Sequence, residues 1–206
     1  MSTRKLFCTL LFFAGIFFLS HAKNNNYVFE DTLVKNKRQY LELRGIVRKS
    51  VRIDQNGEKF LDSAAIKTYN EKNILVSLNY TDKKGKCKIK LPLNKGIYTV
   101  EISKPGCVSK IILVDTQLPP EKKLIYVIPF DLSIFEEVKG LDVSVLKNPV
   151  AKIIYNETIS QFDYDVSYTN EVNANLKKMY SDYYFLLKVD KDFNDSIGPG
   201  IKKANK

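Results

Sequence analysis

Apolar and polar residues alternate along most of the chain between Tyr40 and about residue 135. In KCKIKLPL, residues 86–93, the residues Cys87, Ile89 and Leu91 share one face and the lysines share the other. A period of two residues is typical of a β-strand with one face in a core. The same criterion predicts strands at residues 40–47, 65–70, 74–80, 97–103, 108–115 and 122–135.

Turn signals separate the predicted strands. Residues 81–85 (TDKKG), 94–96 (NKG) and 105–106 (PG) combine side chains that bond to the local backbone with glycines that accept positive φ. Six or seven short strands divided in this way indicate an antiparallel sandwich. We therefore predict a mainly β protein whose residues 39–132 form a seven-strand-type sandwich, prealbumin-like or immunoglobulin-like, followed by a C-terminal α-helix.

The pattern changes after residue 132. Residues 133–165 form an extension with one strand candidate, VAKIIYN at 150–156. Over 166–190 the apolar residues recur at helical spacing, which predicts an α-helix with Thr169 as its N-cap. Residues 191–206 are predicted to be a disordered tail. Since aromatic residues are enriched at interfaces, the helix is expected to present a partner face. That face comprises Tyr180, Tyr183, Tyr184 and Phe185.

The N-terminus has the features of a secretory signal. Arg4 and Lys5 precede the apolar run LFCTLLFFAGIFFL at 6–19, and Ser20-His21-Ala22 offers small residues for cleavage. The alternative is an uncleaved anchor, but the run is short for a bilayer-spanning helix. We predict a signal peptide at 1–22, a flexible leader at 23–38 and an exported protein, periplasmic or outer-membrane-associated. No transmembrane segment is expected after cleavage.

The chain is basic. Its formal net charge of +10 falls to +8 when Arg4 and Lys5 leave with the signal. The lysines that alternate through 86–90 are typical of a solvated strand face, and the alternative is attraction to an anionic glycan or lipid surface. Nucleic acid is not an expected partner, because the sequence lacks a cluster of arginines and aromatics.

Two cysteines, Cys87 and Cys107, remain after signal removal. An even pair in an oxidising compartment allows a disulfide, which would stabilise the fold by roughly 3 kcal/mol. The alternative is that both are small core residues. The choice depends on strand register.

Little in the sequence indicates catalysis. The one histidine, His21, lies in the predicted signal, so the processed chain has no imidazole for nucleophile activation or zinc binding. The carboxylates Asp163 and Asp165 of FDYD would project from one face of an extended segment, but a glycosidase needs such a pair in a cleft. We interpret the segment as a loop whose Phe162 and Tyr164 cover the sandwich. No enzyme activity, cofactor or metal is predicted.

Four segments together resemble the carboxypeptidase regulatory-like, prealbumin-type domain family. They are LRGIV (43–47), FLDSAAIKTYN (60–70), YTDKKGKCKIKLP (80–92) and GIYTVEISKPGCVSK (96–110). Cys87 and Cys107 stand where that family usually has aromatics. The resemblance implies a sandwich that serves as an accessory module.

The segments FEEVKGLDVSVLKNPVAKIIYNE and FDYD are similar to small exported envelope proteins of Bacteroidota. The O-glycosylation system of those bacteria modifies an Asp-Ser/Thr-apolar pattern. Through that resemblance, Thr32, Ser63 and Ser196 are candidate O-glycosylation sites.

These features favour a non-enzymatic exported accessory or scaffold protein of the cell envelope, with an envelope protein as partner. The alternative is a glycan- or peptidoglycan-binding module that uses Tyr69, Tyr80 and Tyr98 as stacking surfaces.

Overall fold

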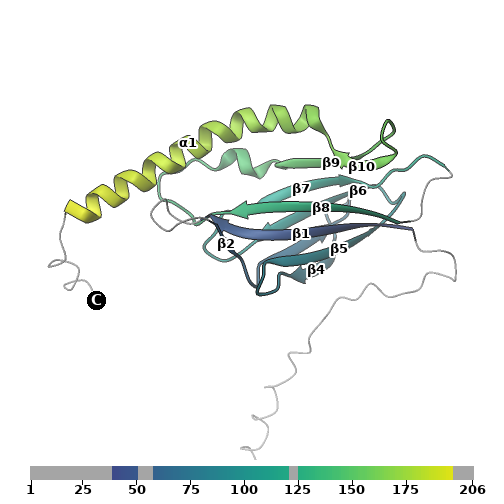
Figure 1. The fold of residues 1–206 in the computed structure, drawn as a ribbon, viewed down its shortest axis with the longest axis horizontal. Coiled ribbons are helices and arrows are strands. Elements are labelled where there is room, and N and C mark those ends of the chain that lie inside the picture. The colour runs from purple at the N-terminus through teal and green to yellow at the C-terminus, as the bar shows by residue number, and fades with distance from the viewer. Residues whose placement is uncertain (1–38, 51–57, 121–124, 197–206) are drawn as a thin grey trace, which may run out of the picture.

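The computed structural model describes residues 39–50, 58–120 and 125–196. Two β-sheets face each other, and one long helix lies along the outside of the sandwich (Figure 1). The predicted fold class, a mainly β sandwich with a C-terminal helix, is confirmed. The predicted signal peptide (1–22), the leader (23–38) and Thr32 lie outside the described residues.

Strand β1 (Tyr40–Ser50) forms the centre of the first sheet. On one side it pairs antiparallel with β5 (Lys86–Pro92) and, further along, with β2 (Glu58–Phe60). On the other side it pairs with β8 (Ile125–Ile134) in parallel. This parallel pair differs from the expected all-antiparallel arrangement. Several strands separate β1 from β8 in sequence, so no tight hairpin forces the two to run in opposite directions.

The second sheet has the strand order β10-β9-β7-β6-β3-β4, in which only β7 and β9 pair in parallel. A 3-10 helix, η1 (Ser144–Lys147), lies between β8 and β9 in sequence. The bounds are β3 (Ala65–Tyr69), β4 (Leu75–Tyr80), β6 (Ile97–Ser103), β7 (Lys110–Asp115), β9 (Ala151–Asn156) and β10 (Gln161–Tyr164).

The main core fills the space between the sheets. It is built from the inward residues of the alternating strands, as predicted for Cys87, Ile89 and Leu91. Gly45 of β1 lies directly opposite Phe130 of β8. The Phe130 ring occupies the space that a side chain at position 45 would need, because a Cβ there would lie 2.0 Å from the ring Cζ.

A second core attaches helix α1 (Val166–Ser196) to the sandwich. On the helix this core consists of Leu176, Met179, Tyr183 and Leu187. They pack against Val108 after the turn that follows β6, Phe135 directly after β8, and Leu146 within η1. The C-terminal part of α1 extends past the ends of the strands (Figure 1).

The helix differs from the prediction at both ends. Asp165, not Thr169, caps it: the Asp165 carboxylate accepts the backbone N–H of Tyr168, at 3.1 Å. The helix continues past residue 190 to Ser196, so the predicted tail begins with helical residues. No glycine or proline interrupts residues 191–196, and the first helix breakers are Gly198 and Pro199.

Candidate functional site

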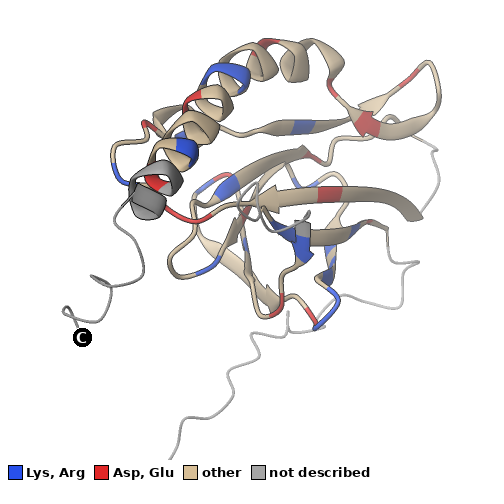
Figure 2. Ribbon diagram, turned by 60° about the vertical axis from the view of Figure 1, so that its left-hand side comes forward, with Lys and Arg blue, Asp and Glu red and all other residues tan. Residues whose placement is uncertain are grey.

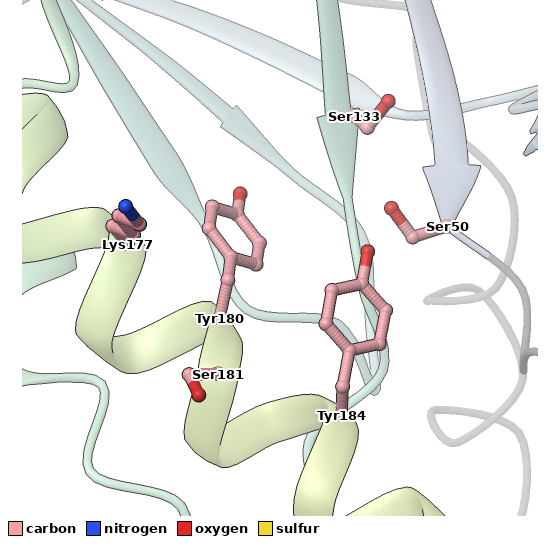
Figure 3. Close-up of a pocket in the computed structure, with 6 residues that line it drawn as sticks. All are labelled: Ser50, Ser133, Lys177, Tyr180, Ser181 and Tyr184. Carbon is pink, nitrogen blue, oxygen red and sulfur yellow. The ribbon is translucent and has the colours of Figure 1, made fainter.

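A pocket of about 480 Å³ lies between helix α1 and the first sheet. Ser50 ends β1 and Ser133 lies near the end of β8, while the facing wall comes from the helix (Figure 3). We call this recess the helix–sheet pocket. Its lining residues are Ser50, Ser133, Lys177, Tyr180, Ser181 and Tyr184.

A buried lysine holds one wall of this pocket in place. Lys110 of β7 donates one hydrogen bond to the Ser133 carbonyl and another to the Tyr180 hydroxyl, the latter at 2.5 Å. Its ammonium also lies 5.3 Å from the centre of the Tyr180 ring and 6.0 Å from that of Phe135. These contacts fix Tyr180 against the sheet.

The helix–sheet pocket offers hydroxyl groups and one lysine. None of its described lining residues is an acid or a histidine, so these residues include no carboxylate or imidazole base beside a hydroxyl. The lining suits hydrogen bonding to a polar group. Sequence reasoning missed Lys110, although the alternation of SKIILVD places it on the same face as the buried Ile112 and Val114.

A second recess, of about 620 Å³, lies on the outer face of the second sheet, and we call it the Tyr80 groove. Tyr80 is 60% exposed there. Glu101 accepts hydrogen bonds from Lys67 Nζ at 3.1 Å and from the Tyr69 hydroxyl at 3.3 Å. The hydrogen bond that Lys67 donates to Glu101 raises the pKa of Lys67, and burial raises the pKa of Tyr69. The full lining is Ser63, Ala65, Lys67, Tyr80, Glu101, Ser103, Lys104, Pro105 and Ser109.

The three tyrosines predicted as stacking surfaces have different environments. Tyr80 is open to solvent and Tyr69 is half-buried against Glu101. Tyr98 is buried in the main core, so it offers no outer surface, and burial raises its pKa. Of the three, Tyr80 is the one that is largely exposed to solvent.

Cys87 and Cys107 are both buried, and neither forms a disulfide. Of the two alternatives that the sequence left open, the structure has the pair of small core residues and not the disulfide. Cys87 belongs to β5 in the first sheet, whereas Cys107 lies in the turn after β6 and pairs with Glu136 through the backbone. Burial raises the pKa of Cys87 to about 11 and also raises that of Cys107. Both thiols are small core groups.

The predicted aromatic partner face divides into two parts. Tyr183 is buried, with its ring centre 4.6 Å from that of Phe135, and Tyr180 is held by Lys110. Tyr184 and Phe185 are 47% and 66% exposed. Neighbouring helical residues point in directions about 100° apart, so these four could not share one face.

The acids of FDYD have structural roles. Residues 162–164 of this segment belong to strand β10, where we expected a loop, and Phe162 is buried in the main core as predicted. Asp163 accepts the backbone N–H of Tyr164 at 2.8 Å. Asp165 caps the helix and lies 3.7 Å from Lys152 Nζ. Asp165 therefore serves as the N-cap of α1.

Two of the three candidate O-glycosylation residues fall in described regions. Ser63 is exposed in a turn with φ of 54°, beside the Tyr80 groove. Ser196 is the last residue of α1. Modification of either residue stays a prediction.

Acidic and basic residues are interspersed along the helix and the sheets (Figure 2). Within the part of the chain that the structure describes, no three His, Cys, Asp or Glu side chains gather as they would to hold a metal ion. No helix among the described residues combines the length and apolarity needed to cross a membrane.

No protein-family model matches this chain, and no curated protein matches it. Among solved structures, the Bacillus anthracis TIE protein is 24% identical over 48% of this chain and 18% of its own, with a TM-score of 0.35. The shaft pilin SpaA from Lactobacillus rhamnosus GG is 13% identical over 49% of this chain and 50% of its own, with a TM-score of 0.32. The catechol 1,2-dioxygenase from Acinetobacter is 15% identical over 56% and 58%, with a TM-score of 0.35.

The chain thus spans a small part of the first of these proteins and about half of the second. At TM-scores this low, none of the three indicates a function. The β-sandwich is established by the strand pairing itself, and the carboxypeptidase regulatory-like assignment stays a prediction.

Proposed function

We propose that this protein is a non-enzymatic, exported accessory protein of the cell envelope, in which the sandwich is a rigid platform for an envelope protein partner. The observation that carries the proposal is the attachment of α1. The second core and the Lys110 hydrogen bonds fix the helix on the sandwich, so the helix–sheet pocket has rigid walls before any ligand arrives. A preformed recess lined by hydroxyl groups and one lysine suits binding, because little ordering is needed on association.

Export is tested by fractionating the native host. The protein is expected in the envelope fraction with Lys23 as its first residue, and a chain lacking residues 1–22 should stay in the cytoplasm. Recovery of the full chain from the cytoplasm, with its N-terminus intact, would refute the proposal.

Partner binding is tested with a photo-crosslinking residue at Tyr184, which is exposed at the rim of the pocket. The matched control places the same crosslinker at Ala174, an exposed position on the first half of the helix. An identified envelope protein should be crosslinked from 184 and not from 174. Equal yields at both positions would count against a binding role for the pocket.

A glycan-binding module is the second candidate, and exposure of the Tyr80 ring beside hydroxyl and charged groups favours it. A sugar could stack on that ring while Glu101 and the serines hydrogen-bond to its hydroxyls. Retention on peptidoglycan or an envelope polysaccharide should be lost in Tyr80→Ala and kept in Tyr80→Phe. Retention no greater than that of a basic protein such as lysozyme would eliminate this candidate.

A further inference from the structure

The pairing register of the first sheet shows which residues lie on its outer face. Strands β8, β1 and β5 run side by side, and residues directly opposite one another project from the same face. We call this surface the β8–β1–β5 face. Its successive rows are Ile125–Tyr40–Pro92, Val127–Glu42–Lys90, Pro129–Arg44–Lys88 and Asp131–Ile46–Lys86.

One end of this face is apolar. Ile125 and Val127 are 50% and 48% exposed, and Pro129 is exposed beside them. Tyr40 and Pro92, which are half-buried, extend the same apolar surface across the other two strands. Aliphatic side chains that remain together on the solvent side of a sheet mark a surface that contacts something apolar.

The opposite edge of the face is a column of lysines. Lys86, Lys88 and Lys90 are all exposed, and alternate residues in a strand lie about 6.6 Å apart. The Lys90 ammonium lies 4.9 Å from the centre of the Tyr40 ring, so the column begins next to the apolar end. A cationic edge and an apolar corner therefore meet on one face of the sheet.

The acids on this face do not cancel the lysines. Glu42 accepts a hydrogen bond from Arg44 at 2.6 Å, and this bond, helped by the charges of Lys88 and Lys90, holds the pKa of Glu42 below its usual value. Asp131 is likewise bonded to a second arginine, Arg48, at 2.8 Å. Each acid is matched by an arginine, and the three lysines remain as net positive charge.

We propose that the β8–β1–β5 face binds the surface of an anionic lipid bilayer. The lysine column contacts lipid phosphates, and Ile125 and Val127 enter the interface between headgroups and acyl chains. Exposed aliphatics beside the cations favour a bilayer over a hydrated acidic polysaccharide, which would offer them no apolar environment. The inference rests on the proposed function in one respect, because export would place the protein beside a membrane.

The test measures partition of the purified, processed protein onto vesicles of phosphatidylcholine with about one-third phosphatidylglycerol, by sedimentation at low salt. Removing three charges with Lys86→Gln, Lys88→Gln and Lys90→Gln should lower the partition coefficient about 100-fold. Replacing Ile125 and Val127 by serine should lower it about tenfold. Wild-type binding should weaken as salt is raised.

A matched control removes the same charge elsewhere, with Lys139→Gln, Lys147→Gln and Lys178→Gln, all exposed positions around η1 and on α1. The partition coefficient of this variant should stay within about threefold of the wild-type value, because the variant loses only long-range attraction to the vesicle. Circular dichroism and gel filtration verify that each variant is folded and monodisperse.

The proposal is overturned if wild type does not sediment with these vesicles, or if both triple variants lose binding equally. It is also overturned if the protein binds an acidic polysaccharide such as polygalacturonate but not the vesicles. Because the assay uses purified protein, its result is independent of the fractionation and crosslinking that test the proposed function.

Discussion

Replacing Gly45 by alanine should strain the contact between β1 and β8. The new Cβ would lie 2.0, 2.4 and 2.6 Å from three carbons of the Phe130 ring, so the ring would have to leave its place in the core. The φ of Gly45 is not in the left-handed region, so the backbone itself accepts alanine. Overpacking of this kind typically costs 1–3 kcal/mol, and displacement of a buried aromatic places this case at about 3 kcal/mol.

Urea unfolding followed by far-UV circular dichroism measures the effect. A double-mutant cycle provides the control: Phe130→Leu alone should cost about 1–2 kcal/mol, while adding it to Gly45→Ala should recover at least about 1 kcal/mol. The smaller side chain leaves room for the new methyl group. A cost below about 0.5 kcal/mol for Gly45→Ala, or strictly additive effects in the cycle, would refute the reasoning.

Three further predictions concern the core thiol, the helix cap and the helix faces. Because the pKa of Cys87 is raised to about 11, the folded state keeps a proton that the unfolded state loses above about pH 9. The free energy of unfolding should therefore fall by up to about 1.4 kcal/mol per pH unit between pH 9 and 11. Urea titrations should show a smaller slope for Cys87→Ala. An unchanged slope would contradict the assignment of this pH dependence to the Cys87 thiol. Asp165→Ala should lower stability by about 1 kcal/mol in thermal unfolding while Asp165→Asn keeps the cap, and equal losses would point instead to the ion pair with Lys152. Tyr183→Ala should cost about 3–5 kcal/mol because its ring is in the second core, whereas Phe185→Ala should change stability by less than about 0.5 kcal/mol; similar costs at both positions would show that the helix is not attached as described.

Local sequence patterns predicted most of the strands well, but they did not predict which strands pair with each other in the sheets. Alternation correctly assigned the inward residues of β5, since one-sided burial fixes which face of a strand is apolar. It could not show that β8 returns to lie parallel beside β1, because that pairing depends on packing between distant segments. Strand β10 was missed because four residues are too few to establish a period.

The candidate sites were predictable only in part. Tyr80 and the alternating lysines of β5 are visible in the sequence, because strand alternation places them on an outer face. The helix–sheet pocket joins Ser50, Ser133 and Tyr180, which come from two strands and a helix far apart in sequence. No local sequence pattern shows that such distant residues lie close together in the fold. The apolar corner beside the lysines likewise emerges only from the register of three strands.

The parallel pairing of β1 with β8 also has a consequence for how the chain reaches its native state. Arg48 and Asp131, which are bonded across this pair, lie 83 positions apart, so the first strand cannot complete its sheet until most of the polypeptide has been made. Folding through so long a loop is slow, because the chain loses conformational entropy before the contacts between β1 and β8 can stabilise it. A nascent chain that stops short of β8 would leave an open strand edge that can recruit a neighbouring molecule, which makes early termination a route to aggregation.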